Sequence, residues 1–297
     1  MYDIIIVGAG PAGLTAALYA GRSNKKVLVF EAKAYGGQIL SANVVSNYPG
    51  IANISGFDYA TNLYNQVIDL GVEVKFETVI SIDEDKNVTT NKGNYKAKAI
   101  ILATGAENRK LRIENEEKLV GKGVSYCATC DGNFYKNKIV AVVGGGNSAL
   151  EDALYLSNLS SKVYLIHRRD TFKGEAKLVS ELNNKKNVEF IFNSNVVRIN
   201  GGDYVESIVV KDNNEKELEL KIDGLFIAVG QEPKNIIFKD IIDIDDKGYI
   251  IAKNDVYTSK KGIYVAGDAR DKILKQLTTA VSDGSIAATV AIKEMED

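Results

Sequence analysis

The sequence has little of several residue types on which common protein chemistries depend. Its 297 residues include only two cysteines and one histidine, and its formal net charge at pH 7 is −2. Two cysteines cannot close a tetrahedral zinc site, and in a reducing compartment a structural disulfide is not expected between them. His167 is the single histidine, so any mechanism that needs a histidine base elsewhere in the chain is excluded.

Charge of one sign and long hydrophobic runs are also lacking. The balance of 37 basic and 39 acidic residues argues against nucleic acid or an anionic membrane as a partner. No uninterrupted apolar run is long enough to cross a bilayer. Residues 4–20 are apolar enough to imitate a signal peptide, but Asp3 replaces the basic start and Gly8, Gly10 and Gly13 interrupt the run. A cytoplasmic location is therefore expected.

A pattern of strand, glycine-rich turn and helix occurs twice in the chain. An apolar strand at residues 3–7 leads into GAGPAG and a helix, and another at 138–143 leads into GGGNSA and a helix. Each unit closes with a second apolar strand, at residues 27–31 and 162–166. Short apolar strands that alternate with helices are typical of parallel sheets covered on both faces. The sequence therefore predicts an α/β protein with two Rossmann-like dinucleotide-binding domains.

The order of the segments predicts that the second domain is inserted into the first. Further strands that end in glycine are expected at residues 99–105, 224–230 and 262–268, followed by a closing helix at 278–295. Polar stretches at 107–110 and 231–235 bracket the middle third and are the candidate linkers. The expected limits are 1–109 and 233–297 for a discontinuous first domain, and 110–232 for an inserted domain that carries the cysteines.

The first glycine turn has the full context of a dinucleotide site. Gly8 permits the tight turn, Gly10 lets a pyrophosphate approach the backbone, and Gly13 lets helix and strand pack closely. The N-terminus of the helix supplies unpaired N–H groups for phosphates. Glu31, at the end of the second strand, can accept hydrogen bonds from an adenosine ribose. The alternative is a glycine turn in an α/β domain that binds no nucleotide.

The second turn follows the same rule, but its second strand ends in basic residues instead of an acid. The turn residues of the predicted site are Gly144, Gly146, Asn147, Ser148 and Ala149, and the strand end contributes His167, Arg168, Arg169 and Lys173. A carboxylate would repel a 2′-phosphate, whereas arginine holds it with two hydrogen bonds, so NADPH is favoured over NADH. A solvated basic strand end is the alternative, and for His167 a structural or adenosine-side role is favoured over catalysis.

The two cysteines stand three residues apart, as Cys127 and Cys130, and are followed by Asp131 and a glycine. A CxxC pair lowers the pKa of one thiol, and disulfide exchange needs both a thiolate and a proton for the leaving sulfur. Asp131 is placed to move that proton if burial raises its own pKa. An inert buried cysteine pair and a plain Asp-Gly turn are the alternative interpretations.

These motifs, in this order, resemble the low-molecular-weight thioredoxin reductases over essentially the whole chain. The matching segments are GAGPAG at 8–13, GGQ at 36–38, CATCDG at 127–132, GGGNSA at 144–149, HRR at 167–169 and AGD at 266–268. The resemblance implies a homodimer in which electrons pass from NADPH to FAD, then to the Cys127–Cys130 disulfide, and then to thioredoxin. It also implies that Asp131 acts as an acid and that Arg168 and Arg169 hold the 2′-phosphate.

The resemblance implies that the discontinuous domain, 1–109 and 233–297, binds FAD and that the inserted domain, 110–232, binds NADPH. It further assigns residues to the FAD site. Asp268 is expected to contact the flavin ribitol. Other residues expected there are Pro11, Ala12, Gly36, Gly37, Gln38, Asn47, Ala103, Thr104, Gly105, Gly267, Lys275, Gln276 and Leu277.

The chain departs from the family pattern in three places. Lys173 stands where the family usually has an arginine, and lysine keeps the charge but loses the planar fork. Lys122, before the redox pair, is commonly an arginine in the family, and Asn133 and Phe134 follow the Asp-Gly pair where most members have two aromatic residues. These last two positions resemble a partner-docking surface and leave the electron acceptor open. A related reductase that uses ferredoxin as donor, or that acts on another thioredoxin-like or peroxidase-linked carrier, is the nearest alternative. A nucleotide-binding redox sensor without catalysis is a more distant one.

Overall fold

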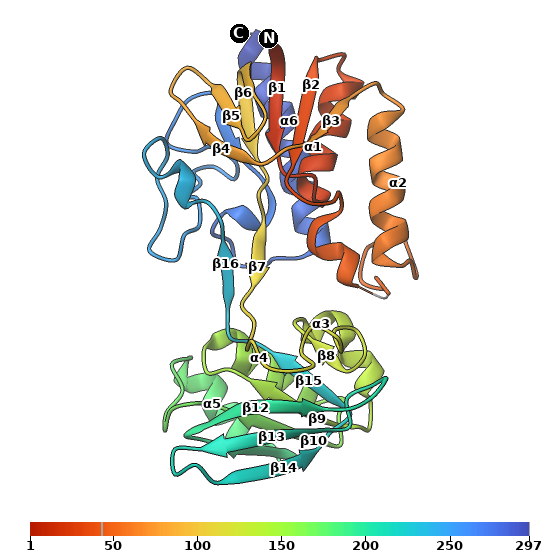
Figure 1. The fold of residues 1–297 in the computed structure, drawn as a ribbon, viewed down its shortest axis with the longest axis vertical. Helices are drawn as coiled ribbons and strands as arrows, with labels where there is room; N and C mark the ends of the chain where they lie inside the picture. The colour runs from red at the N-terminus through yellow and green to blue at the C-terminus, as the bar shows by residue number, and fades with distance from the viewer. Residues whose placement is uncertain (43, 297) are drawn as a thin grey trace. The chain divides into compact units, whose positions relative to one another are not determined.

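The computed structural model describes residues 1–42 and 44–296. The chain forms two compact units: unit 1 comprises Met1–Glu107 and Glu232–Asp297, and unit 2 comprises Asn108–Gln231 (Figure 1). These limits lie within two residues of those expected from the sequence. The assignment of one dinucleotide to each unit stays a prediction.

Unit 1 is built on a seven-stranded sheet with the order β3-β2-β1-β6-β5-β4, in which β17 also pairs with β6. The strands are β1 (Tyr2–Val7), β2 (Val27–Glu31), β3 (Glu73–Phe76), β4 (Val79–Ile82), β5 (Asn87–Thr90), β6 (Asn94–Leu102) and β17 (Ile263–Val265). The pairs among β1, β2, β3, β6 and β17 are parallel, as expected for a Rossmann-like sheet. The antiparallel β4–β5 hairpin is an addition that the sequence pattern did not predict.

Helices cover one face of this sheet. They are α1 (Pro11–Arg22), α2 (Gly56–Ile68) and α6 (Leu277–Glu296). Unit 1 also contains the short 3-10 turns η1 (Gly37–Ser41), η3 (Ile236–Phe238) and η4 (Gly267–Ala269). The predicted closing helix is confirmed as α6. On the opposite face, β4 and β5 share a core with Phe238 and Ile242.

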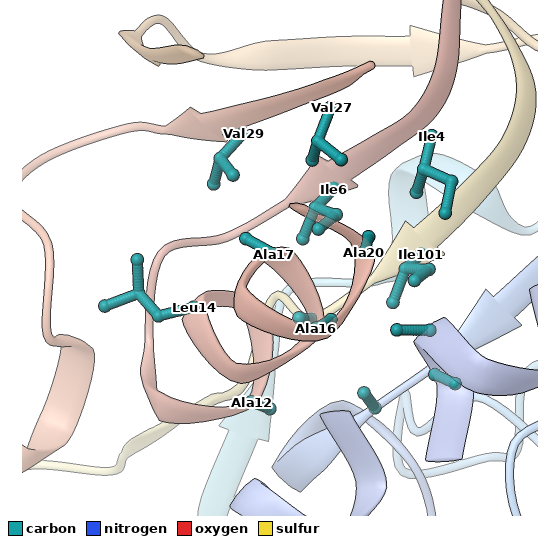
Figure 2. Close-up of a cluster of buried hydrophobic side chains, with 14 of the residues drawn as sticks. Ile4, Ile6, Ala12, Leu14, Ala16, Ala17, Ala20, Val27, Val29 and Ile101 are labelled. Atoms are coloured by element: carbon teal, nitrogen blue, oxygen red, sulfur yellow. The ribbon is translucent and has the colours of Figure 1, made fainter. Parts of the chain in front are cut away.

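Small residues let α1 and α6 lie close to the sheet and to each other. Ala16, Ala17 and Ala20 of α1 face the branched side chains of β1 and β2 (Figure 2). A Cβ on Gly284 of α6 would lie 2.2 Å from the carbonyl oxygen of Ala12, so only glycine fits at this crossing. This packing fixes where the N-terminus of α1, and with it the first glycine turn, sits relative to the ends of the strands.

Unit 2 repeats the parallel pattern in a five-stranded sheet with the order β11-β10-β9-β15-β8. The strands are β8 (Val124–Ser125), β9 (Ile139–Val143), β10 (Lys162–Ile166), β11 (Val188–Ile191) and β15 (Gly224–Ile227). The helices are α3 (Ala128–Asp131), α4 (Asn147–Ser157) and α5 (Ala176–Asn183), with a 3-10 turn η2 (Gly132–Tyr135). A three-stranded antiparallel sheet of β12 (Ser194–Asn200), β13 (Ser207–Asp212) and β14 (Glu217–Lys221) was not predicted.

The two connections between the units are the short strands β7 (Ala106–Asn108) and β16 (Gln231–Pro233), which pair with each other. The second predicted linker, 231–235, extends too far. Asn235 is completely buried in unit 1, where its amide donates to the carbonyl oxygens of Gly248 and Ala269 at 3.0 and 2.9 Å. Among the described residues, no helix combines the length and apolar character needed to span a membrane.

Candidate active site

The first glycine turn joins the end of β1 to the start of α1. A Cβ on Gly8, whose φ is +108°, would lie 2.3 Å from the carbonyl oxygen of Ala103, and one on Gly13 would lie 1.8 Å from that of Gly8. In contrast, a Cβ on Gly10 would meet no atom within 4 Å from the described residues beyond its chain neighbours and its own helix. Two glycines are therefore required by packing, and the third leaves open space at the helix N-terminus, where the backbone N–H groups bind anions well.

Glu31 at the end of β2 is fixed beside this turn. One carboxylate oxygen accepts from the backbone N–H of Ala9 at 2.9 Å, and the other accepts from that of Lys33 at 2.9 Å. Each oxygen retains a lone pair, because a carboxylate has about four acceptor positions. The geometry suits a bidentate contact to the hydroxyls of a ribose.

The turn after β17 carries a buried acid with an unused oxygen. Gly267 has a φ of +74°, and a Cβ there would lie 2.8 Å from the side chain of Ala12. Oδ1 of Asp268 is buried and has no hydrogen-bond partner among the described residues; the nearest ammonium, that of Lys272, is 3.7 Å away. An unpartnered buried acceptor of this kind fits a ligand hydroxyl. Burial raises the pKa of Asp268, against the opposing charges of Lys272 and Lys275.

A second buried carboxylate, Asp283 on α6, holds this turn in place. It accepts from the backbone N–H of Gly267 at 3.0 Å, from Nε of Arg270 at 2.9 Å and from Nζ of Lys272 at 3.1 Å. No pattern in the sequence marks Asp283 as a site residue, because its partners come from another segment. Nearby, burial lowers the pKa of Lys275 to about 8, and its ammonium lies 3.4 Å from the ring centre of Tyr249.

The other predicted FAD-site residues of unit 1 lie around these two turns. Gly36, with a φ of +102°, donates its N–H to the carbonyl oxygen of Ala9 at 2.7 Å. A Cβ on Gly37 would lie 3.3 Å from the Cα of Gly10, so this segment borders the open space described above. The amide of Gln38 donates to the carbonyl oxygen of Ala106.

Side-chain hydrogen bonds tie the remaining segments together. The amide of Asn47 donates to the side-chain oxygen of Gln276 at 3.0 Å. The hydroxyl of Thr104, beside Ala103 and Gly105, donates to Oδ1 of Asn235 at 2.6 Å. Asn235 was not predicted as a site residue, since a buried role cannot be read from its position in a polar stretch. Leu277 begins α6.

The second glycine turn, in unit 2, has the same construction between β9 and α4. A Cβ on Gly144 would lie 2.4 Å from the carbonyl oxygen of Ala228 and 2.6 Å from the side chain of Ala149. A Cβ on Gly146 would meet no atom within 4 Å from the part of the chain that the structure describes, apart from its sequence neighbours and its own helix. Asn147 exchanges hydrogen bonds with Glu175, at 3.0 and 2.8 Å. Ser148 is exposed in the first turn of the helix.

Three basic side chains lie beyond the end of β10. Arg168, Arg169 and Lys173 are exposed, and none of them takes part in the ion pairs found within residues 1–42 and 44–296. The backbone N–H of Lys173 donates to the carbonyl oxygen of Gly145 at 2.7 Å, which brings the basic segment to the glycine turn. The three cations are thus available to an anionic ligand at this turn.

His167 plays a structural part at the same turn. Its buried ring occupies the space next to Gly145, where a Cβ would lie 2.1 Å from Cε1, and it stacks on Phe172 with ring centres 5.5 Å apart. Burial lowers the pKa of His167, and the charges of Arg168 and Arg169 act in the same direction. The ring is therefore neutral at pH 7 and shapes the turn by packing.

The redox pair lies at α3 of unit 2. Cys127 and Cys130 form a disulfide, with their Cα atoms 5.3 Å apart. Cys127 precedes the helix, and its sulfur accepts from the backbone N–H of Cys130 at 3.2 Å. The hydroxyl of Thr129 is 3.4 Å from the same sulfur.

Asp131 ends α3 and is held by Ser125 at the end of β8. The Ser125 hydroxyl lies 2.7 Å from Oδ2 of Asp131 and accepts from the backbone N–H of Cys127 at 3.1 Å. Burial raises the pKa of Asp131, and the hydrogen bond from Ser125 opposes this rise without cancelling it. A carboxyl group in such a site keeps its proton more readily than one in water, which suits a proton donor. Ser125 was not predicted as a site residue.

Comparison with known proteins agrees with this arrangement. Residues 2–284 match the family model described as pyridine nucleotide-disulphide oxidoreductase. A thioredoxin reductase of Treponema pallidum is 43% identical over 98% of this chain and 96% of its own length, and a "34.2 kDa protein in rubredoxin operon" of Clostridium pasteurianum is 44% identical over the same shares. The crystal structure of thioredoxin reductase from Streptococcus pyogenes is 40% identical, covers 100% of this chain and 98% of its own, and has a TM-score of 0.95. This chain belongs to the pyridine nucleotide-disulphide oxidoreductase family.

Proposed function

We propose that this protein is a thioredoxin-disulfide reductase that passes electrons from NADPH through FAD and the Cys127–Cys130 disulfide to thioredoxin. The observation that carries the proposal is the disulfide beside the buried acid Asp131, in the same unit as a dinucleotide-type glycine turn. Relatives named thioredoxin reductase that match this chain over nearly its whole length support the choice of substrate.

FAD is the cofactor that unit 1 suits. The open space at Gly10 would take its pyrophosphate, Glu31 its adenosine ribose, and the unpartnered oxygen of Asp268 a ribitol hydroxyl. Gly37 borders that space, because a Cβ on it would lie 3.3 Å from the Cα of Gly10. Bound flavin would supply a two-electron carrier between nicotinamide and disulfide.

NADPH is the donor that unit 2 suits. The open space at Gly146 would take the pyrophosphate at the start of α4. Arg168 and Arg169, together with Lys173, would bind the 2′-phosphate, which NADH lacks. Because these cations have no ion-pair partner among the described residues, nothing has to be displaced for the phosphate to bind.

The reduced cysteine pair transfers two electrons to thioredoxin in two exchange steps. One thiolate attacks the thioredoxin disulfide, a mixed disulfide forms, and the sulfur that leaves takes the proton of Asp131. The other cysteine thiol passes its proton to the Asp131 carboxylate and attacks the mixed disulfide. This restores the Cys127–Cys130 disulfide and releases the second thioredoxin sulfur, which takes that proton and leaves dithiol thioredoxin.

Anaerobic stopped-flow absorbance of the flavin tests the donor. Rapid bleaching is expected with NADPH and much slower bleaching with NADH. Arg168→Gln and Arg169→Gln, each made alone, should raise the apparent Kd of NADPH about 10- to 100-fold, because one arginine–phosphate contact contributes about 1.5–3 kcal/mol. Arg198→Gln, at an exposed arginine of the same unit, is the matched control and should leave it unchanged. Equal rates with NADPH and NADH would contradict the choice of NADPH.

The acceptor is tested by adding oxidised thioredoxin to the reduced protein. Return of the oxidised flavin spectrum, with formation of thioredoxin thiols, is the expected result. The exposed side chain of Phe134, next to the redox pair, is a candidate contact, and Phe134→Ala should raise the KM for thioredoxin. A protein bleached by NADPH that does not react with thioredoxin would instead indicate another carrier.

We also propose that the protein is a cytoplasmic homodimer. Unit 1 exposes large apolar side chains at Phe57, Ile273 and Leu274, which a second copy could cover. A cycling cysteine pair suits the reducing cytoplasm. Sedimentation at micromolar concentration should give twice the chain mass of 32.3 kDa, and a monomer would contradict the proposal.

A further inference from the structure

The hydroxyl of Ser125 stands where three groups of the redox loop meet. It lies 2.7 Å from Oδ2 of Asp131, 3.1 Å from the backbone nitrogen of Cys127 and 3.3 Å from the carbonyl oxygen of Cys127. A serine hydroxyl has one proton to donate. The shorter contact, to a carboxylate, is the stronger one, so the proton points to Asp131 while the oxygen accepts from Cys127.

We propose that Ser125 is a positioning residue of the reaction: it fixes the Asp131 carboxyl group relative to the cysteine pair and stabilises the carboxylate that remains after proton donation. This inference rests on the proposed reductase function. It goes beyond that function because it gives a second side chain, Ser125, a role in the proton transfer. In the proposed steps, Ser125 touches neither thioredoxin nor a cofactor.

The position of Ser125 is itself fixed by its surroundings. Its side chain is buried, and it pairs with Phe226 in the parallel ladder of β8 and β15. Just before it, Gly123 has a φ of +118°, and a Cβ there would lie 2.6 Å from the side chain of Val205. Just after it, the hydroxyl of Tyr126 donates to Glu116 at 2.7 Å. Contacts on both sides of Ser125 therefore hold the end of the strand in position.

Asp131 depends on this one partner. Within residues 1–42 and 44–296, Ser125 is the only side chain that hydrogen-bonds to its carboxyl group. The backbone N–H of Asp131 donates to the carbonyl oxygen of Cys127 at 3.1 Å, which closes a small ring of contacts with Ser125. Without the hydroxyl, the carboxyl group would lose both its orientation and its only donor.

Two other titratable groups lie near Asp131 without a hydrogen bond to it. Burial is the main reason that the pKa of Tyr135, on η2, is raised to about 12, and the charge of Asp131 adds to this rise. On α4, which packs against α3, burial and then Glu151 raise the pKa of Asp152 to about 7. Asp152 titrates within the pH range of the assay, so an experiment has to separate its contribution to the pH profile from that of Asp131.

The effect of removing the hydroxyl has a definite sign. Burial raises the pKa of Asp131 and the hydrogen bond from Ser125 opposes the rise, so Ser125→Ala should raise that pKa further. The acid would then give up its proton less readily. We expect the rate of thioredoxin reduction to fall about tenfold and its pH profile to move up by about one pH unit, as for loss of a hydrogen bond to a charged group.

The test compares four variants in the flavin-loaded protein, of which Asp152→Asn removes the other carboxyl group that titrates in this pH range. Ser125→Ala removes the hydroxyl, Ser125→Thr keeps it, and Ser194→Ala removes another buried hydroxyl of unit 2, which donates to the carbonyl oxygen of Phe192 at 2.8 Å. Flavin reduction by NADPH and reoxidation by thioredoxin are measured separately between pH 5.5 and 9. The carbon-13 chemical shift of the Asp131 carboxyl group is titrated in the oxidised protein.

Only Ser125→Ala should change, with slower reoxidation, an unchanged KM for thioredoxin, and titration of Asp131 at higher pH. Flavin reduction should stay as in the wild type, because it precedes the proton donation. The proposal would be overturned if Ser125→Ala kept the wild-type rate of reoxidation, the wild-type pH profile and the wild-type titration of Asp131. It would also be overturned if Ser125→Thr lost as much of the reoxidation rate as Ser125→Ala. The same pH profile in Ser125→Ala but a shifted one in Asp152→Asn would assign the titration to Asp152 and also overturn it. If NADPH bleaches the wild-type protein but thioredoxin does not reoxidise it, the proposed function is refuted. The carboxyl titration would still show whether Ser125 controls the pKa of Asp131.

Discussion

Replacement of Asp283 by asparagine should destabilise unit 1 severely, although it changes only one atom. The carboxylate is the shared partner of Arg270 and Lys272, and the three side chains are only 6%, 14% and 7% exposed. Asparagine keeps the shape but removes the charge, so two buried cations would face each other without it. The nearest remaining carboxylate is Asp268, 3.7 Å from Lys272.

The magnitude follows from the burial of this cluster. Removing one partner of a buried ion pair costs about 3–5 kcal/mol, because the other charge is left uncompensated. For a unit of this size, each kcal/mol lowers the thermal midpoint by about 2–4 °C, which gives a drop of about 6–20 °C. Flavin binding should weaken as well, since Asp283 also holds the N–H of Gly267 in the turn that presents Asp268.

The dependence on pH has a predictable sign. Burial acts to raise the pKa of Asp283, but the hydrogen bond from Arg270 and the charge of Lys272 outweigh it and hold this pKa below its usual value. A carboxyl with a depressed pKa contributes stability above its unfolded pKa of about 3.9 and loses it as the pH falls through the folded value. The difference between wild type and variant should therefore be full at pH 7 and shrink below pH 4.

Circular dichroism and the release of flavin fluorescence, both followed during heating, measure the effect. Asp246→Asn, in an exposed loop of the same unit, is the matched control and should melt as the wild type does. A thermal midpoint of Asp283→Asn within 2 °C of the wild-type value, or a difference that grows below pH 4, would refute the reasoning.

Three further outcomes are expected. Gly13→Ala should fail to fold or to bind FAD, because its Cβ would lie 1.8 Å from a backbone oxygen. Gly10→Ala should fold, but it should lose FAD affinity about tenfold or more because the methyl group fills the open space. Flavin content and equilibrium dialysis distinguish the two variants. Cys127→Ser and Cys130→Ser should each abolish thioredoxin reduction yet leave flavin reduction by NADPH intact, and residual turnover with thioredoxin in either variant would contradict the assigned electron path. Burial raises the pKa of Asp152 to about 7, so its ionisation opposes folding as the pH rises above its unfolded pKa of about 3.9. Asp152→Asn should therefore flatten the fall in thermal midpoint between pH 5 and pH 8, and an unchanged fall would argue against this origin.

Local signals in the sequence were enough to predict both glycine turns and most of the parallel strands. A glycine turn after an apolar strand depends on backbone freedom at a few adjacent positions, so Gly8 and Gly144 could be recognised without any knowledge of distant contacts. The inserted order of the two units also followed from motif order, and the pairing of Cys127 with Cys130 from their spacing.

The antiparallel additions could not be predicted in the same way. The strands β12, β13 and β14 are short and mix polar with apolar residues, and what makes them a sheet is pairing between segments, including a bulge near Val196. The periodicity of one segment does not determine its partner.

The sequence by itself determined the fold class, the two dinucleotide-type turns and the cysteine pair, because each rests on residues close together in the chain. Only the tertiary structure decided which side chains support them. Ser125 meets Asp131 through the end of one strand and a one-turn helix, Asn235 reaches Thr104 across 131 positions, and Asp283 reaches the turn at Gly267 from α6. Hydrogen bonds of this kind form because packing removes both partners from water together, and no local pattern records which partners those will be.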